Sequence, residues 1–244
     1  MTTMTTTRTT APKTMACSVK TLALAALCVP CLSLMACKQQ TSSGPTSGAS
    51  VASASAPASS SASPSGAASG AAAAVVALNR ATAEKGDAQA QYDLGQAYAT
   101  GQGVAHDDAQ ALSWFGKAAA QGFAPAQISL GKMYVTGQGV TQDYAQAVFW
   151  YRKAASQGNA LAQNNLGVMY SEGVGVTRDN AQALAWFRKA ADQGFAPAQY
   201  DLGRMYQNGA GVARSNAQAA FWYRKAASQG NAQAKSALDE LKPR

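Results

Sequence analysis

Apolar residues recur at intervals of three and four positions from about residue 74 onward, which is the period of an amphipathic α-helix. Short polar connectors interrupt this pattern twice in every unit, so each unit is predicted to contain two helices. In the first unit the two apolar faces consist of Ala88, Ala90, Leu94 and Tyr98, and of Ala111, Trp114, Phe115 and Ala118. Two helices in every unit predict an all-α fold.

The helical units repeat with a constant length. All four tryptophans of the chain are spaced by 36 residues, and a glycine and a tyrosine of each unit follow the same spacing. A period of this length is typical of solenoids, in which each unit packs on its neighbours and the ends carry capping helices. The recurring residues are Trp114, Trp150, Trp186 and Trp222; Gly86, Gly122, Gly158, Gly194 and Gly230; and Tyr98, Tyr134, Tyr170 and Tyr206. We place a repeat domain at 74–244, with repeats at 86–121, 122–157, 158–193 and 194–229 and capping helices at 75–85 and 230–241.

Glycines and short polar residues predict where the helices end. In the first unit, Gly101 is expected to end a helix in the left-handed conformation and Gly103 to permit a tight turn. Asp107 is expected to favour the next helix as a cap or as an acid in its first turn. Gly95 lies inside the first helix, where glycine costs about 1 kcal/mol relative to alanine. We therefore expect a tryptophan of a second helix to pack against this position. The equivalent residues are Gly137, Gly173 and Gly209; Gly139, Gly175 and Gly211; Asp143, Asp179 and Ser215; and Gly131, Gly167 and Gly203.

The repeated unit resembles a known family. Its features Ala-x-x-Leu-Gly-x-x-Tyr-x-x-Gly-x-Gly-Val and Trp-x-x-Lys-Ala-Ala are similar to those of the Sel1-like repeats, which are relatives of the tetratricopeptide repeats. The resemblance covers Gly86 to Gln229. It implies a right-handed α-solenoid of antiparallel helix pairs, and a protein that acts as an adaptor for other proteins through a concave groove. No cofactor is implied.

The N-terminal segment has the order of a secretory signal. A basic and polar stretch is followed by an apolar run from Leu22 to Leu34, and Leu34-Met35-Ala36-Cys37 resembles the lipobox of bacterial lipoproteins. We predict a signal peptide at 1–36 and lipidation of Cys37. A start at Met15 and an uncleaved membrane helix remain alternatives, although the apolar run is shorter than the roughly 20 residues that span a bilayer.

The next segment, residues 37–73, consists mainly of Ser, Ala, Gly, Pro and Thr and is predicted to be a disordered tether. Half of the net charge of +8 comes from residues in or beside the N-terminal segment, Arg8, Lys13, Lys20 and Lys38, and the rest is scattered, so nucleic acid is not an expected partner. We expect an exported protein that is lipid-anchored in the bacterial envelope and binds envelope proteins or peptides. The residue after Cys37 is Lys38, whereas an Asp at this place retains many enteric lipoproteins at the inner membrane. By this resemblance we expect the protein on the periplasmic face of the outer membrane.

Catalytic and metal-binding patterns are weak. All four cysteines lie in the first 37 residues, which excludes a disulfide framework for the repeats. Ser129 and Lys132 match the Ser-x-x-Lys pattern of penicillin-recognising enzymes, but the accompanying motifs are missing. His106 is the only histidine and makes a poor metal site alone. We predict no catalytic residue, metal or cofactor; an envelope enzyme, or a protein that interacts with peptidoglycan or β-lactams, remains the alternative.

Residues of the first helices that change from unit to unit are candidates for partner recognition, because the shared residues carry the common packing. The alternative is that these residues form only a solvated helix surface. Two of the three positions in each unit are three residues apart and share a helix face. The candidate groove residues are Tyr92, Asp93 and Gln96; Ile128, Ser129 and Lys132; Asn164, Asn165 and Val168; and Tyr200, Asp201 and Arg204.

Overall fold

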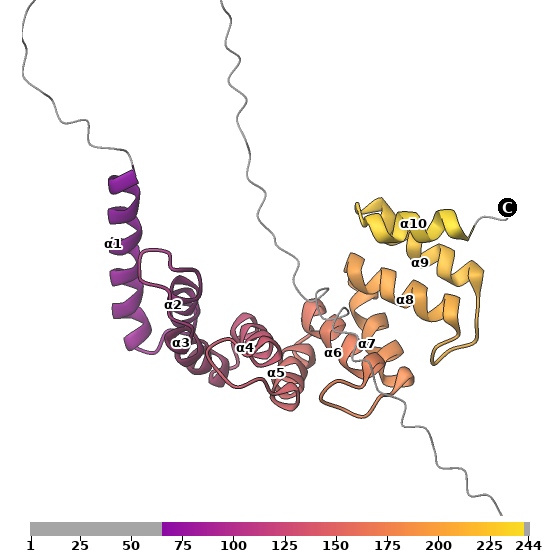
Figure 1. The fold of residues 1–244 in the computed structure, drawn as a ribbon, viewed down its shortest axis with the longest axis horizontal. Coiled ribbons are helices and arrows are strands. Elements are labelled where there is room, and N and C mark those ends of the chain that lie inside the picture. Colours follow the sequence, from indigo (N-terminus) through magenta and orange to yellow (C-terminus); the bar gives the residue numbers. More distant parts are fainter. Residues whose placement is uncertain (1–64, 242–244) are drawn as a thin grey trace, which may run out of the picture. The chain divides into compact units, whose positions relative to one another are not determined.

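A computed structural model describes residues 65–241, and this part of the chain consists of ten α-helices without a strand (Figure 1). The predicted signal peptide at 1–36, the lipidated Cys37 and most of the predicted tether lie outside the described residues. The helices are α1 (Ser65–Glu84), α2 (Ala88–Thr100), α3 (Asp108–Ala120), α4 (Ala124–Thr136), α5 (Tyr144–Ser156), α6 (Ala160–Glu172), α7 (Asn180–Asp192), α8 (Ala196–Asn208), α9 (Asn216–Ser228) and α10 (Ala232–Glu240).

The helices stack in chain order. Consecutive helices pack against each other from α1 to α10, and the pairs α2·α3, α4·α5, α6·α7 and α8·α9 form the most extensive contacts. Every helix from α2 to α9 is 13 residues long, which matches the constant period of the sequence. The all-α solenoid predicted from the sequence is confirmed. Within the described range, none of these helices has the length and hydropathy needed to cross a membrane.

Helix α1 is longer than the sequence pattern indicates. It begins at Ser65, so it includes residues 65–73, which the sequence analysis assigned to the tether. Alanine is the residue with the highest helix propensity, and Ala71 to Ala74 form an uninterrupted run within this stretch. The helix can therefore begin before the residues that the repeat pattern predicts to be helical.

The predicted helix ends are confirmed. The first glycine of each connector, for example Gly101 with φ of 72°, is left-handed and follows directly on the first helix. Asp107 then caps α3, because its side chain accepts a hydrogen bond from the backbone N–H of Gln110 at 2.9 Å. The equivalent caps are made by Asp143, Asp179 and Ser215. These caps satisfy backbone donors that the helix itself leaves unpaired.

The glycine in the middle of each first helix faces a different ring from the one we expected. A Cβ atom on Gly95 would lie 2.7 Å from Cδ1 of Phe115, the residue after Trp114. The same holds for Gly131 with Tyr151, Gly167 with Phe187, and Gly203 with Tyr223. The expectation that tryptophan packs on this glycine was therefore wrong. One step along a helix rotates a side chain by about 100°, which brings the second aromatic residue, and not the tryptophan, onto the glycine.

The tryptophans instead connect neighbouring repeats. Trp222 is buried in one cluster with Phe187, Leu202 and Met205, which belong to α7 and α8. Trp114 joins a cluster that includes Val76 of α1. Trp150 is half-buried and packs against a cluster formed by α3 of the preceding repeat and α4 of its own repeat. The large rings thus fill the space between units, as expected when each repeat stabilises the next.

Buried glutamines also link the repeats. Gln163 of α6 donates from Nε2 to the backbone carbonyl of Ala155, on the second helix of the preceding repeat, at 3.2 Å. Its Oε1 accepts from Nε2 of Gln193, at the end of α7, at 2.7 Å. The same pair of bonds is formed by Gln91, Gln127 and Gln199. Because buried polar groups are costly unless paired, this ladder fixes the alignment of successive units.

Substitutions at two glycines test whether the second-helix ring requires a glycine in the middle of the first helix. We expect Gly95→Ala to lower the free energy of unfolding by about 1–2 kcal/mol, since the new methyl group collides with Phe115 and overpacking outweighs the gain in helix propensity. Gly116→Ala, on α3, is the matched control, because nothing lies within 4 Å of its Cβ position. It should raise the same free energy by up to about 1 kcal/mol. Urea unfolding of both variants measures this difference, and equal effects would refute the assignment.

Candidate functional site

The candidate groove residues lie on α2, α4, α6 and α8, but they differ widely in exposure. Three of them, Gln96, Lys132 and Arg204, occupy the same repeat position and are exposed. Asn164 and Asn165 are buried, with 8% and 5% of their surface exposed. The remaining residues, Tyr92, Asp93, Ile128, Ser129, Val168, Tyr200 and Asp201, are half-buried. The solvent-facing part of the candidate groove is therefore formed mainly by one position per unit.

The first of the three positions contributes to packing. The ring of Tyr92 lies 5.5 Å from that of Phe115 and 5.4 Å from that of Phe123, measured between centroids. Tyr200 lies 5.7 Å from Tyr223 in the same way. Variation at this position changes how each unit fills the space beside its second-helix aromatic residue.

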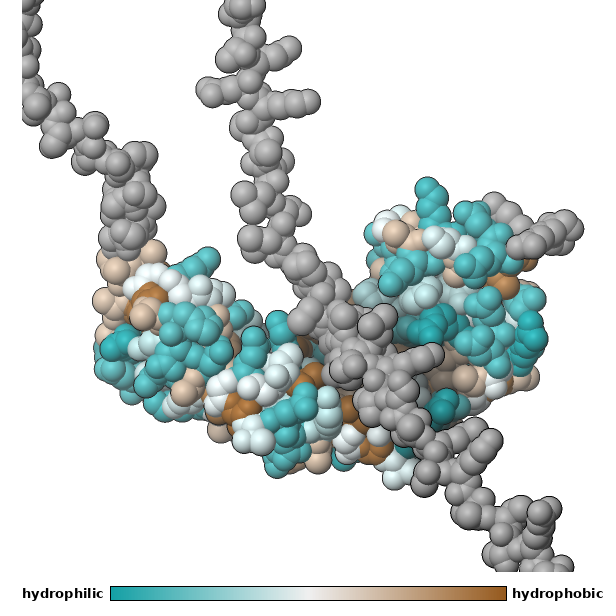
Figure 2. Space-filling model, in the orientation of Figure 1, coloured by the Kyte–Doolittle hydropathy of each residue, from teal (hydrophilic) through white to brown (hydrophobic). Residues whose placement is uncertain are grey.

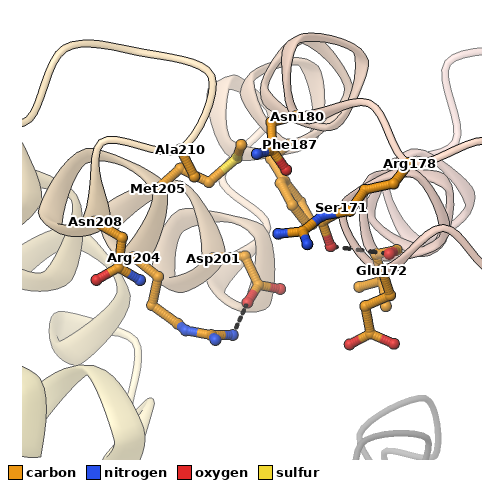
Figure 3. A pocket seen from close by; sticks show the side chains of 11 residues that line it. Ser171, Glu172, Arg178, Asn180, Phe187, Asp201, Arg204, Met205, Asn208 and Ala210 are labelled. Carbon is orange, nitrogen blue, oxygen red and sulfur yellow. Dashed lines mark hydrogen bonds and ion pairs between the residues drawn. The ribbon is translucent and has the colours of Figure 1, made fainter. Parts of the chain in front are cut away.

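Three candidate residues meet in one cavity. Val168, Asp201 and Arg204 line a cavity of about 210 Å³ that we call the α6–α8 pocket (Figure 3). Side chains from the end of α6, from the connector that follows it, from α7 and from α8 converge there. The other lining residues are Ser171, Glu172, Arg178, Asn180, Phe187, Met205, Asn208 and Ala210.

Two carboxylates, of Glu172 and Asp201, and two guanidinium groups, of Arg178 and Arg204, line the α6–α8 pocket. Arg204 Nη1 lies 3.4 Å from Asp201 Oδ1, and the Asp201 side chain is only 18% exposed. Burial raises the pKa of Asp201 to about 6, against the opposing effect of Arg204 and with a further increase from Glu172. Burial also raises the pKa of Glu172, which Arg204 partly offsets. Both carboxyl groups therefore carry their charge at a free-energy cost.

Several residues of this pocket were missed by the sequence analysis. Glu172 and Asn208 end their helices, and Arg178 and Asn180 lie at the start of the second helix or just before it. A usable signal was present, because the position of Glu172 also varies between units: it is Thr100, Thr136 and Asn208 elsewhere.

The raised pKa of Asp201 predicts a pH-dependent stability. The folded state holds this proton more tightly than the unfolded chain, whose pKa is near 3.8, so the free energy of unfolding falls as pH rises from about 4 to 6. Asp201→Asn removes the charge and should stabilise the protein at pH 7 by about 1–2 kcal/mol, after allowance for the lost ion pair with Arg204. Urea unfolding at pH 4 should show little difference between the two proteins. Exposed Asp192→Asn is the control, and an Asp201→Asn protein that is less stable at pH 7 would contradict the prediction.

A second cavity containing candidate residues lies between α1 and α2. It has a volume of about 380 Å³, and Asp93 and Gln96 contribute to its lining together with Val75, Val76 and Asn79. The apolar side chains of α1 dominate here. The two cavities occupy equivalent places in the repeat frame but differ in chemistry.

The remaining chemical candidates do not assemble into a site. His106 Nε2 lies 3.3 Å from Asp108 Oδ1 in an exposed connector. No hydrogen bond or ion pair joins Ser129 to Lys132 in the described part of the chain, and residues 65–241 contain no cluster of three potential metal-ligating side chains. Figure 2 shows hydrophobic areas that are small and set among larger hydrophilic ones on the visible face.

Helix pairs that stack on their neighbours with a fixed period define the class of α-solenoid repeat proteins. Comparison with family models then identifies the family: the chain belongs to the Sel1 repeat family, whose model matches residues 88–123, 124–159, 160–195 and 196–231. Proteins of this kind are generally scaffolds for protein–protein interaction and typically not enzymes.

Solved structures of similar sequence support this assignment. A Sel1 repeat protein from Oxalobacter formigenes is 31% identical, with a TM-score of 0.66 over 70% of this chain and 71% of that one. A protective antigen of uropathogenic Escherichia coli with an SLR fold is 48% identical, with a TM-score of 0.64 over 65% of this chain. The match spans 34% of the antigen's own length. A comparison with curated proteins finds no significant match.

Proposed function

We propose that the protein is a lipid-anchored scaffold of the bacterial envelope that binds other proteins or peptides along its first helices. One observation carries the proposal. Several positions that pack the repeats together, such as those of Gln91 and Leu94, are the same in every unit, whereas the exposed position on the first helix is Gln96, Lys132 or Arg204 in three of them. An exposed position whose side chain changes from unit to unit on a constant helical frame supports recognition by this face of the first helices.

The envelope location rests on the N-terminal sequence. The tripartite segment that ends at Cys37 supports export, cleavage and acylation of that cysteine. Mass spectrometry of the membrane fraction should find a mature chain that begins with a diacylated Cys37. Membrane attachment and processing that persist unchanged in Cys37→Ala would refute the anchor.

The recognition surface is tested by charge reversal. Lys132→Glu with Arg204→Glu changes two exposed first-helix residues, and Lys117→Glu with Lys189→Glu makes the same charge change on exposed positions of the second helices. Bait proteins are mixed with detergent-solubilised envelope, and the captured proteins are quantified. We expect the first pair to reduce capture at least tenfold, as for binding hot spots, while the second pair leaves it within twofold. Equal capture by both pairs, or loss only on changing the connector at His106, would place the surface elsewhere.

A further inference from the structure

We propose that copies of this chain stack end to end, so that α10 of one copy and α1 of the next form one further helix pair of the solenoid. We call this contact the end junction. The inference goes beyond the capture of other proteins and concerns a different surface. It rests on the half-units at the two ends, on the uncovered apolar face of α1, and on a polar pair in place of a ring and a glycine.

The two end helices are halves of one repeat. Helix α1 occupies the place of a second helix, because Arg80 donates to the hydroxyl of Tyr98, as arginines of α5 and α7 do to tyrosines of α6 and α8. Helix α10 occupies the place of a first helix, and Asn231 caps it by accepting from Ala234, a cap that α6 shares. Among the described residues, α1 has no first helix before it and α10 has no second helix after it (Figure 1). Each end of the described solenoid therefore carries the half that the other end lacks.

The face of α1 that a first helix would cover is apolar and open to solvent. Val75 and Leu78 are 58% and 70% exposed, the highest values among the large hydrophobic side chains of the described residues. In the next unit the same positions hold Ala111 and Trp114, which are 0% and 9% exposed. A helix that only caps a solenoid is expected to be polar on its outer side. The apolar face of α1 instead favours a contact with another protein surface.

The opposite end of the solenoid offers a matching apolar cluster. In the last complete unit, Trp222 is buried in one cluster with Phe187 of α7 and residues of α8. One repeat later, Tyr223 and Leu238 belong to the equivalent cluster between α9 and α10, to which the described residues contribute no tryptophan. At the end junction, Leu78 of the next copy takes the place of that tryptophan. It would then cover Leu238, which is only half-buried in the single copy.

A polar pair replaces the ring and the glycine at the end junction. In every complete unit a buried ring of the second helix lies against a glycine of the first helix, as Phe115 does against Gly95. The repeat frame puts Asn79 of α1 in the place of the ring and Asp239 of α10 in the place of the glycine. Asparagine is smaller than a phenyl ring, which leaves room for an aspartate, and its amide can donate to the carboxylate. The departures from the repeat at the two ends therefore complement each other.

Two lysines oppose the contact and limit its strength. Gln121, at the end of α3, donates to Gln91 of α2, and the repeat frame puts Lys85 and Lys235 in these two places at the end junction. Both lysines are exposed in the single copy. Like charges repel less when salt screens them, so association should be weak and should strengthen with ionic strength. Because the two joined faces differ, each stacked pair keeps two free ends, and the product is an open row of copies.

Cross-linking between two different variants tests the end junction. Asn79→Cys and Asp239→Cys are made in full chains whose four native cysteines are replaced by serine, and the two proteins are mixed and oxidised. A disulfide between residues 79 and 239 of these proteins must be intermolecular, and it forms only where the side chains come into contact. We expect this disulfide, identified by peptide mass spectrometry, in the mixture. Exposed Asp192→Cys replaces Asp239→Cys in the control mixture and should give only background cross-linking to residue 79.

Sedimentation velocity of the same cysteine-free chain measures the equilibrium. Leu78→Glu should weaken association at least about tenfold, because it puts a charge where a leucine would be buried. Leu161→Glu makes the same change at another exposed leucine, on α6, and should leave association within about twofold. Lys235→Gln copies the glutamine of the complete units and should strengthen association about threefold. Circular dichroism checks that each variant keeps its helices.

Two results would overturn the proposal. The first is a chain that stays monomeric at every concentration, with and without Lys235→Gln, as expected if the segment before residue 65 or a different protein covers α1. The second is a disulfide yield no higher than that of the control mixture, or association that Leu78→Glu leaves unchanged, since either places the contact on another face. Lys132 and Arg204, which test the capture of other proteins, lie outside the end junction. Stacking and capture can therefore each fail without the other.

Discussion

Replacing Phe115 with alanine is expected to lower the free energy of unfolding by about 3–5 kcal/mol, the largest effect we predict. The ring is 2% exposed, packs against Gly95 and joins a cluster rich in alanine, including Ala111 and Ala126. Small side chains cannot move in to fill the space that a phenyl ring leaves, so most of the cavity would persist. Urea unfolding measures the decrease in the free energy of unfolding. Hydrogen exchange should show reduced protection first in α2 to α4.

Exposed Phe149→Ala is the control for this substitution, because the Phe149 ring is 46% exposed and its removal should cost less than about 1 kcal/mol. A double-mutant cycle sharpens the test. Gly95→Ala destabilises the parent protein, but in Phe115→Ala the new methyl group meets no ring, so its effect should become neutral or stabilising. Additive effects would show that Gly95 and Phe115 do not act on each other.

The second large effect is expected for Gly139→Ala, at about 2–5 kcal/mol. The residue has φ of 67°, which costs alanine about 1–2 kcal/mol. Its Cβ would also lie 2.5 Å from the carbonyl oxygen of Asp108, and a clash with backbone adds about 1–3 kcal/mol. The sequence analysis treated this glycine as a turn residue, whereas the structure shows that it lets the connector approach the second helix of the preceding repeat.

Gly158→Ala separates the two causes, since Gly158 has φ of 87° and nothing lies within 4 Å of its Cβ position. It should cost only the backbone component of about 1–2 kcal/mol. Thermal and urea unfolding of the two variants provide the comparison. If Gly139→Ala lowers the free energy of unfolding no more than Gly158→Ala does, the close approach between repeats does not contribute to stability.

The sequence by itself determined the features that depend on residues close together in the chain. The helical period, the left-handed Gly101 and the capping Asp107 all follow from contacts within a few residues, and each was predicted correctly. The repeat period also identified the solenoid, because an identical unit must pack on its neighbours in the same way each time.

Only the tertiary structure decided which side of each helix meets which neighbour. Trp114 and Phe115 are adjacent and both apolar, and the rotation of α3 about its axis alone places Phe115 on Gly95 and Trp114 against the preceding unit. The α6–α8 pocket depends in the same way on residues 29 positions apart, Glu172 and Asp201, which approach each other when α6 and α8 pack beside α7. A sequence pattern carries no record of such rotations and distances, since they are settled by the joint packing of several helices.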